Sequence, residues 1–381
     1  MTSPSGPRRL GVDSPAALLA IIPHLLGFVP DHSLVLIGAG APSGRIDLAV
    51  RFDLPDPPDA GATAAIAAHA TTLLDPPEVT TAVIIGYGPG PLVTPLADAL
   101  RQALADTKVT LRDVLRVEGN RYWSYLCGEP SCCPPDGVPF DAARHPAAAV
   151  MTVPGHHVLA SRAALAATIA PVTGLAAEAM QRETRRAERI AAKLVAGMAG
   201  PDAPPGGPRP IAARGLTAVQ AAITAYRQGG TINHSSQFAW LALVLTSLRV
   251  RDDAWARMDP ARHHAHQRLW TDLTRHAQPG YIPAAASLLA FTAWQGGNGA
   301  LANLALDRAL DDDPRYSMAL LLRDVIGAGA PPSLARLPMT PEEVAVSYGD
   351  LPGEAPPGNA PLGEGDDLGQ AAGDGPDGTT A

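Results

Sequence analysis

The chain has 381 residues, of which 46% are hydrophobic and 17% are charged, and its formal net charge at pH 7 is -8. This composition is that of a globular protein with enough apolar residues for a core, and the length predicts two to three domains of roughly 150 residues each. The negative charge and the lack of a basic run argue against binding to nucleic acid or to an anionic membrane.

The first 30 residues have some features of an export signal, because Arg8-Arg9 precedes the apolar stretch 16–29. Pro23-His24 splits that stretch, and no small-residue cleavage site follows it, so we do not expect export. No stretch of the chain reaches the roughly 18 apolar residues of a membrane helix. We therefore expect a cytoplasmic protein without a membrane span, in which cysteines are thiols or metal ligands rather than disulfides.

Helical and strand patterns alternate in the first half of the chain. Ser14-Pro15 predicts the start of a helix that ends near Leu26, and strands and helices then follow in turn. The predicted ranges are strands 33–37 and 46–53, helix 60–74, strand 80–85, helix 94–106, strands 112–118 and 121–126, and helix 176–198. This order predicts an α/β domain with a mixed sheet and flanking helices over residues 10–200.

The clearest strand pattern runs from Ile46 to Asp53. Its even-numbered residues are apolar and predict one buried face, whereas Asp47, Arg51 and Asp53 lie on the other face. Gly119-Asn120 predicts a tight hairpin turn between the two later strands, with Glu118 opposite Arg121.

Residues 201–213 are rich in proline and glycine and predict a linker, because such a segment cannot continue a helix. An all-α domain is predicted for residues 214–348. Its expected helices are 217–228, 237–250, 261–276, 283–295, 300–311 and 317–327. Residues 349–381 are rich in Gly, Pro, Asp and Glu, and their composition predicts a disordered acidic tail.

Two consecutive segments of the helical half resemble one tetratricopeptide-type helical pair. Small residues recur where two helices would approach closely, at Ala290, Ala302, Ala305 and Ala309, and Trp294 lies near the turn between the helices. Only about one and a half such units are visible, so we expect them to cap the helical bundle.

All three cysteines, Cys127, Cys132 and Cys133, lie in one short stretch with several aromatic residues. Thiolates are ligands that zinc prefers, and His145, His156 or His157 would offer a fourth ligand. Against a zinc site, the spacing is not that of paired Cys-x2-Cys knuckles, and adjacent cysteines are not expected to turn easily toward one ion. A redox pair and a set of buried structural thiols are the alternatives.

A second candidate site combines residues from several predicted elements. Gly86 and Gly88 lie in a loop between a strand and a helix, where backbone N–H groups bind anions in many α/β proteins. The loop lacks the dinucleotide and Walker patterns, so an ordinary strand-to-helix connection is the favoured interpretation. The full candidate pocket for a small polar substrate consists of Asp47, Arg51, Gly86, Gly88, Arg121 and Trp123.

His263, His264 and His266 invite a metal hypothesis. On a helix, residues 263 and 266 share a face that 264 does not, so at most two of them are ligands of one ion. A polar helix surface is the simpler interpretation.

Several segments along the chain together resemble the actinobacterial domain of unknown function 4192 family. They are Leu26-Gly27-Phe28-x-Pro30-x-x-Ser33-Leu34-Val35, Arg121-Tyr122-Trp123-Ser124 with Cys127 and Cys132-Cys133-Pro134, Ala239-Trp240-Leu241, Gly280-Tyr281, and Asp307-Arg308-Ala309-Leu310. The resemblance covers about residue 10 to about residue 348. It implies an actinobacterial, cytoplasmic protein that keeps both halves in one unit, and it implies no particular reaction.

No complete set of catalytic residues is visible, which favours a non-catalytic binding or adaptor protein that contacts a protein partner through its helical domain. The alternative is an enzyme for a small polar or anionic substrate, with a metal- or thiol-containing site near Cys127, Cys132 and Cys133; no cofactor is identified, and zinc is the candidate metal. An enzyme requires the candidate residues to converge on one concave pocket, whereas an adaptor requires an exposed groove.

Overall fold

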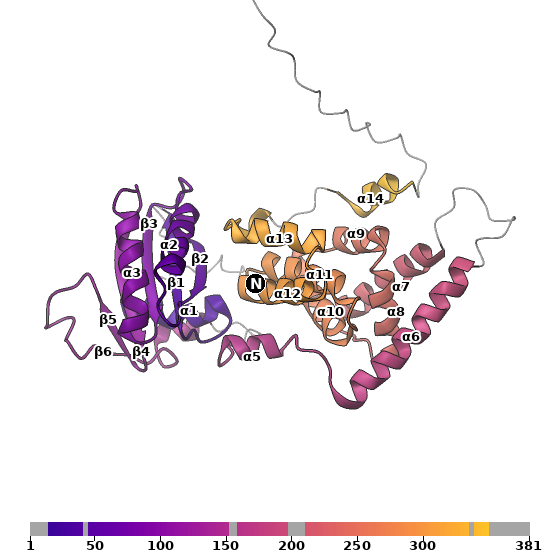
Figure 1. Cartoon of the computed structure of the whole chain (residues 1–381), viewed down its shortest axis with the longest axis horizontal. Helices are drawn as coiled ribbons and strands as arrows, with labels where there is room; N and C mark the ends of the chain where they lie inside the picture. Colours follow the sequence, from indigo (N-terminus) through magenta and orange to yellow (C-terminus); the bar gives the residue numbers. More distant parts are fainter. Residues whose placement is uncertain (1–13, 41–44, 152–157, 197–209, 335–338, 350–381) are drawn as a thin grey trace, which may run out of the picture.

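The structure is a computed structural model that describes residues 14–40, 45–151, 158–196, 210–334 and 339–349. A part with a β-sheet and a part made only of helices lie side by side (Figure 1). Most of the predicted linker and, apart from Gly349, the predicted acidic tail lie outside the described residues.

The first part contains a six-stranded mixed sheet, as predicted. Its order is β2-β1-β3-β4-β5-β6; β3 and β4 are parallel, and all other neighbours are antiparallel. Its elements are α1 (Pro15–Leu26), β1 (Ser33–Gly40), β2 (Arg45–Asp53), α2 (Ala60–Leu74), β3 (Thr81–Tyr87), α3 (Gly90–Leu104), β4 (Thr110–Glu118), β5 (Arg121–Ser124), β6 (Val138–Pro139) and α4 (Pro146–Met151).

Each face of the sheet has its own apolar core. Helices α2 and α3 cover one face, where Leu36, Ile84 and Val114 are fully buried. The opposite face, which includes Val35 and Ile85, belongs to a core that also contains α1 and extends through the helical part. Because one continuous core joins the two parts, their relative position depends on packing as well as on chain connection.

The predicted alternation of β2 is confirmed in its second half and fails at its start. Leu48, Val50 and Phe52 pack in the core under α2 and α3, as expected. Ile46 instead packs against the other core, because the β1–β2 register shifts between Gly38 and Ala39. An extra residue in one strand reverses the alternation, so the side chains before and after it no longer follow a single pattern of faces.

The predicted hairpin between β4 and β5 is confirmed. Glu118 pairs with Arg121 across the turn, and Gly119 has a φ of 59°, a left-handed conformation that glycine adopts without strain.

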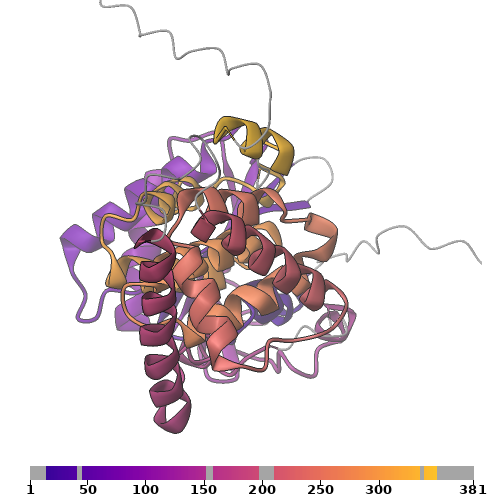
Figure 2. The ribbon, with the colours of Figure 1, turned by 90° about the vertical axis from the view of Figure 1, so that its right-hand side faces the viewer.

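The remaining helices form the second part (Figure 1). They are α5 (Arg162–Ala167), α6 (Gly174–Ala196), α7 (Pro210–Arg227), α8 (Ser235–Val244), α9 (Leu248–Ala256), α10 (His263–His276), α11 (Ile282–Gln295), α12 (Gly299–Asp312), α13 (Ser317–Gly327) and α14 (Pro341–Ser347), with short 3-10 turns at Pro260–Arg262 and Pro332–Leu334. Helix α6 packs against α8 and α7 on the outside of this part (Figure 2). Helices α11 and α12 pack closely together.

The single helix predicted for residues 237–250 is wrong, since the structure has two helices there. Helix α8 ends at Val244 and α9 begins at Leu248. The hydroxyl of Thr246 donates to the carbonyl of Leu243 at 2.7 Å, so it competes with the main-chain bonds that would continue the helix.

A connecting segment, residues 158–173, holds the two parts together. At its start, the main chain of Leu159 accepts a hydrogen bond from Val29 and donates one to Gly27, both at 2.9 Å. Further along, the guanidinium of Arg308 donates to the carbonyl of Ile169, and Val172 donates to the carbonyl of Arg275 at 3.0 Å. We call this segment the strap.

Within the helical part, His266 on α10 is 1% exposed, and neither ring nitrogen has a hydrogen-bond partner among the residues that the structure describes. Burial lowers its pKa to about 4, and the nearby charge of Arg227 acts in the same direction, whereas Asp259 opposes it. The folded protein therefore holds this imidazole neutral at pH values where an exposed histidine is protonated.

We predict that His266 makes the protein less stable in mild acid. Between pH 6.5 and pH 4 the unfolded chain binds a proton that the folded chain does not, so stability present above pH 6.5 is lost as the pH falls through this window. The loss between pH 7.5 and pH 5 is about 2 kcal/mol from this residue alone. Urea unfolding at both pH values should show that His266→Leu removes this loss.

The matched control is His234→Leu, because His234 is exposed. This variant should retain the full acid sensitivity of the parent chain. An equal loss of stability in the parent and in His266→Leu would contradict the assignment.

Candidate functional site

A cleft lies between the sheet and the helices, and Arg162 of the strap is one of its lining residues. Its volume is about 540 Å³, and residues 46–51 of the strand β2 form one wall. Helices α11, α12 and α13 form the other wall, through Trp294, Ala300, Asn303, Asp307, Arg323 and Ile326. We call this cavity the β2 cleft.

The edge of β2 that faces the cleft carries unpaired main-chain groups. Among the described residues, β1 is the one strand that pairs with β2. The amide of Leu54 donates to the carbonyl of His32, and antiparallel pairing alternates every second residue, so Phe52 and Val50 bond to β1. The N–H and C=O groups of Arg51 and Ala49 therefore point outward.

The charged side chains of the cleft are balanced. Arg51 is largely buried and donates to the hydroxyl of Ser33 at 2.8 Å and to the carboxylate of Asp53 at 2.5 Å. Across the cleft, Asp307 accepts from Arg323 at 2.8 Å and from Arg162 of the strap at 3.5 Å. Each of these guanidinium groups already has a carboxylate partner.

Sequence reasoning identified Asp47 and Arg51 of this cleft and missed its opposite wall. Arg162 and Arg323 belong to no motif. Asp307 and the neighbouring Arg308 belong to the segment Asp307–Leu310, one of those on which the family resemblance rests, and that resemblance is the one sequence signal that pointed to this wall.

The six residues of the predicted pocket do not line one cavity. Asp47 and Arg51 lie on β2, whereas Arg121 and Trp123 lie on β5, with three strands between them. Gly86 lies on β3 and Gly88 follows it, beside α3.

Gly86 has a packing role. A Cβ atom at this position would lie 2.1 Å from a methyl carbon of Val93, so only glycine lets α3 approach β3 this closely. Gly88 has a φ of 141°, which side-chain-bearing residues rarely adopt. An ordinary strand-to-helix connection accounts for both glycines.

Arg121 and Trp123 hold the loop that contains the cysteines. The guanidinium of Arg121 donates to the carbonyl of Gly137 at 2.7 Å, and the indole of Trp123 donates to the carbonyl of Pro135 at 3.0 Å. Gly137 lies against the indole ring, since a Cβ there would be 2.6 Å from it. These contacts fix the end of the loop that leads into β6.

The three thiols converge at the exposed end of this loop. The Sγ atom of Cys132 lies 3.6 Å from the Sγ atoms of both Cys127 and Cys133. All three sulfur atoms lie within 4.8 Å of one another, and no other such group of metal-ligating side chains exists among the described residues. The expectation that adjacent cysteines would not turn toward one point is therefore wrong.

Hydrogen bonds between the thiols shift their pKa values in opposite directions. Hydrogen bonds from Cys133, from the backbone of Glu129 and from Cys132 lower the pKa of Cys127, because they stabilise its thiolate. The pKa of Cys133 is raised to about 12, first because of its hydrogen bond to Cys127. Of these two thiols, Cys127 therefore loses its proton before Cys133.

Of the predicted fourth ligands, His145 is not part of this group, and it accepts a hydrogen bond from the amide of Ala147 at 3.2 Å. His156 and His157 lie outside the described residues. His263 and His264 line a separate cavity of about 450 Å³ beside the strap, where their rings lie 3.9 Å apart.

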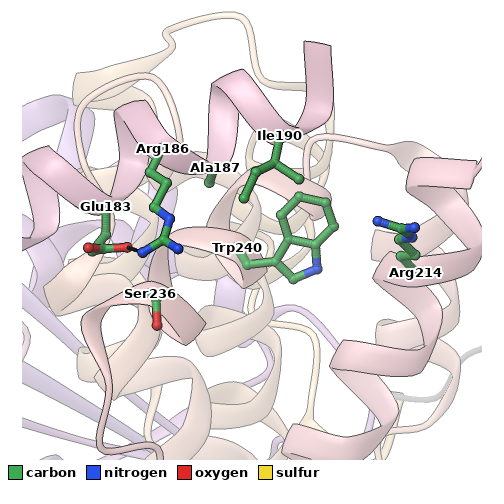
Figure 3. A pocket seen from close by; sticks show the side chains of 7 residues that line it. All are labelled: Glu183, Arg186, Ala187, Ile190, Arg214, Ser236 and Trp240. Carbon is green, nitrogen blue, oxygen red and sulfur yellow. Dashed lines mark ion pairs between the residues drawn. The ribbon is translucent and has the colours of Figure 1, made fainter. Parts of the chain in front are cut away.

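The helical part has a groove of its own, of about 400 Å³, between α6, α7 and α8 (Figure 3). The indole of Trp240 lies between the side chains of Ile190 and Arg214, and Glu183 and Arg186 form an ion pair of 3.8 Å at the other end. We call this feature the Trp240 groove. It is the groove that the adaptor hypothesis requires on the helices.

Comparison with known protein families identifies the family of this chain. The family model described as Domain of unknown function (DUF4192) matches residues 15–333, which include the β2 cleft, the Trp240 groove and the cysteine loop. The chain belongs to this family. The match begins at the first residue of α1 and ends before α14, so it contains both walls of the cleft. No curated protein and no solved structure matches the chain.

We predict that Gly86→Ala lowers the free energy of unfolding by roughly 1 to 3 kcal/mol, because the new methyl group collides with Val93. Val93→Ala in the same chain should recover part of that loss, so the two substitutions should couple by at least about 1 kcal/mol in a double-mutant cycle measured by urea unfolding.

Gly299→Ala is the matched control, since a Cβ atom there meets nothing within 4 Å. It should leave stability unchanged within about 0.5 kcal/mol. A Gly86→Ala variant as stable as this control would contradict the packing role.

Proposed function

We propose that the protein is a non-catalytic adaptor that binds an extended segment of a partner protein in the β2 cleft. The segment adds to the sheet as a further strand beside β2. The observation that supports this proposal is the outward direction of the main-chain groups of Ala49 and Arg51 into a cavity of about 540 Å³. Such an edge pairs readily with another strand, and several peptide-binding domains use this mode.

The charges in the cleft favour a polypeptide over a small anion. Three carboxylates and three guanidinium groups line the cavity, so its formal charge is zero. An anionic substrate would have to displace Asp307 from Arg162 and Arg323, and lose the energy of those ion pairs. The main chain of a peptide is neutral and needs only the hydrogen bonds that the edge offers.

The walls provide two kinds of contact for the side chains of a bound strand. Leu26 and Phe28 supply apolar surface on one side, and Asn303 supplies a polar group on the other. Side chains of a strand point alternately to opposite faces, so a peptide with alternating apolar and polar residues fits this cleft.

The Trp240 groove is a second surface for a partner, and it corresponds to the contact expected through the helical domain. Its aromatic anchor and the arginines at positions 186 and 214 suit an acidic segment with an apolar side chain. We favour the β2 cleft because its main-chain groups require hydrogen-bond partners, whereas the Trp240 groove has no comparable requirement.

Several finer features belong to the same proposal. The parts before and after the linker act as two domains in one unit, and α11 with α12 forms a tetratricopeptide-like pair that supports the wall of the cleft. The protein acts in the cytoplasm and does not bind nucleic acid. No helix among the described residues is long and apolar enough to cross a membrane.

The alternative function is an enzyme that acts on a small polar or anionic substrate at a metal- or thiol-containing site near the three cysteines. The convergence of the thiols supports it. The exposure of that loop argues for the adaptor, because an enzyme excludes water from its reacting groups.

We predict that Ala49→Pro weakens peptide binding at least tenfold. Proline removes the outward N–H of residue 49 and leaves the bonds between β2 and β1 in place, and proline is tolerated on edge strands. Peptides would be selected from a random displayed library on the full chain, and their Kd values measured by fluorescence polarisation. Ala49→Val keeps the N–H group and should bind within about threefold of the parent.

Trp240→Ala distinguishes the two surfaces. Peptides that lose affinity in Trp240→Ala and keep it in Ala49→Pro would place the site in the Trp240 groove. A library that yields no binder would contradict the proposal.

A further inference from the structure

We propose that Cys127, Cys132 and Cys133 bind one zinc ion through three thiolates, with a fourth coordination position open to solvent. This site does not depend on the proposed peptide binding, because it lies at the opposite edge of the sheet from β2.

The positions of the sulfur atoms fit a tetrahedral zinc ion. Two thiolates bound to one zinc ion at 2.3 Å are about 3.8 Å apart. The two Sγ to Sγ distances around Cys132 are 3.6 Å. This separation is well beyond the roughly 2 Å of a disulfide bond. Both of these sulfur pairs therefore lie at metal-ligand spacing.

The backbone explains how neighbouring cysteines reach one point. The carbonyl of Glu129 accepts hydrogen bonds from the amides of both Cys132 and Cys133, at 3.1 and 2.7 Å. A single tight turn thus sets the direction of both residues. The prolines at 130 and 134, which flank this turn, restrict its backbone further.

Cys127 is set by a separate anchor. Its amide donates to the hydroxyl of Ser124 at 3.2 Å, and that hydroxyl donates to the carboxylate of Asp113 on β4 at 2.7 Å. Tyr125 follows Ser124 in the chain, and its hydroxyl forms a hydrogen bond of 2.8 Å with the hydroxyl of Thr94 on α3. The sheet and α3 therefore position the first ligand, and the turn at Glu129 positions the other two.

The loop has no apolar core that would otherwise account for this shape. No side chain from 126 to 136 is buried, although both ends of the loop are fixed by hydrogen bonds. Small exposed loops with this property commonly depend on a metal ion or a disulfide for their conformation. With three sulfur atoms within 4.8 Å of one another, one more than a disulfide uses, the metal ion is the better fit.

The ligand set selects the ion. Soft thiolates prefer zinc, copper(I) and iron–sulfur clusters, and clusters need four protein ligands in their usual form. Zinc accepts three thiolates and a water molecule in a tetrahedral site. Binding releases the protons of those thiols that are still protonated, so affinity should rise with pH.

The test is the metal content of the full chain, purified without a histidine tag from cells grown with added zinc and measured by elemental mass spectrometry. We expect about one zinc ion per chain, and at least a fivefold lower content in Cys132→Ser and in Cys127→Ser. Ser131→Ala lies in the same turn without a ligand atom that joins the group, and it should keep the parent content.

A second measurement serves if a cysteine variant fails to fold. Zinc would be removed from the parent chain with a chelator, and Co²⁺ would be added to the folded apo-protein, where a thiolate-to-cobalt absorption band that saturates at one ion per chain supports the site. Chains that contain no zinc and show no such band overturn the proposal. Chains that are lighter by two hydrogens, because a disulfide joins Cys127 to Cys132, overturn it in favour of a redox pair.

Discussion

The hydrogen bonds of the strap are the interaction on which the rest of the molecule depends. At its start the main chain of Leu159 bonds to the turn after α1, and near its end the carbonyl of Ile169 accepts from Arg308 on α12. The strap therefore bonds to both parts of the protein within about a dozen residues. The core around α1 is continuous through both parts and adds apolar contact to these bonds. Together they position the sheet relative to the helices, and the β2 cleft lies between these two parts.

The ion pairs in the cleft also act across the strap. Arg162 belongs to the strap and shares Asp307 with Arg323 of α13. Exposed ion pairs contribute little free energy by themselves, so these pairs do not bring α5, α12 and α13 together. They add stability only because packing already holds the three helices close to one another. The charged wall of the cleft is thus a result of the junction, and a variant that loosens the strap would change both the width and the charge pattern of the cavity.

Local patterns in the sequence predicted local structure well. The cap at Ser14, the hairpin at Gly119-Asn120 and the second half of β2 all depend on neighbouring residues, and all are confirmed. What failed depends on contacts between distant segments. The order of the strands in the sheet makes β2 an edge strand and separates Arg51 from Arg121. The spacing of residues along the chain does not reveal this order. Likewise, the register shift between Gly38 and Ala39 places the side chain of Ile46 on the face opposite to the predicted one. The carbonyl of Glu129 accepts hydrogen bonds from two adjacent cysteines and so directs both toward one point, although their spacing in the sequence argued against such convergence.

The two edges of the sheet differ in length and in exposure of their main chain, and each of the two proposed sites lies at one of these edges. An exposed strand edge invites unwanted pairing, so proteins shorten it, cover it or interrupt it with proline. The far edge is short and interrupted by proline, because β6 contains two residues, one of them Pro139. A zinc ion in the cysteine loop, which precedes β6, would help to hold this short strand in place. The edge of β2 is long, its charged side chains are paired, and the helices stand back from it across a cavity. A sheet that only needed protection would have both edges closed, so the open one is the edge on which a partner strand would add.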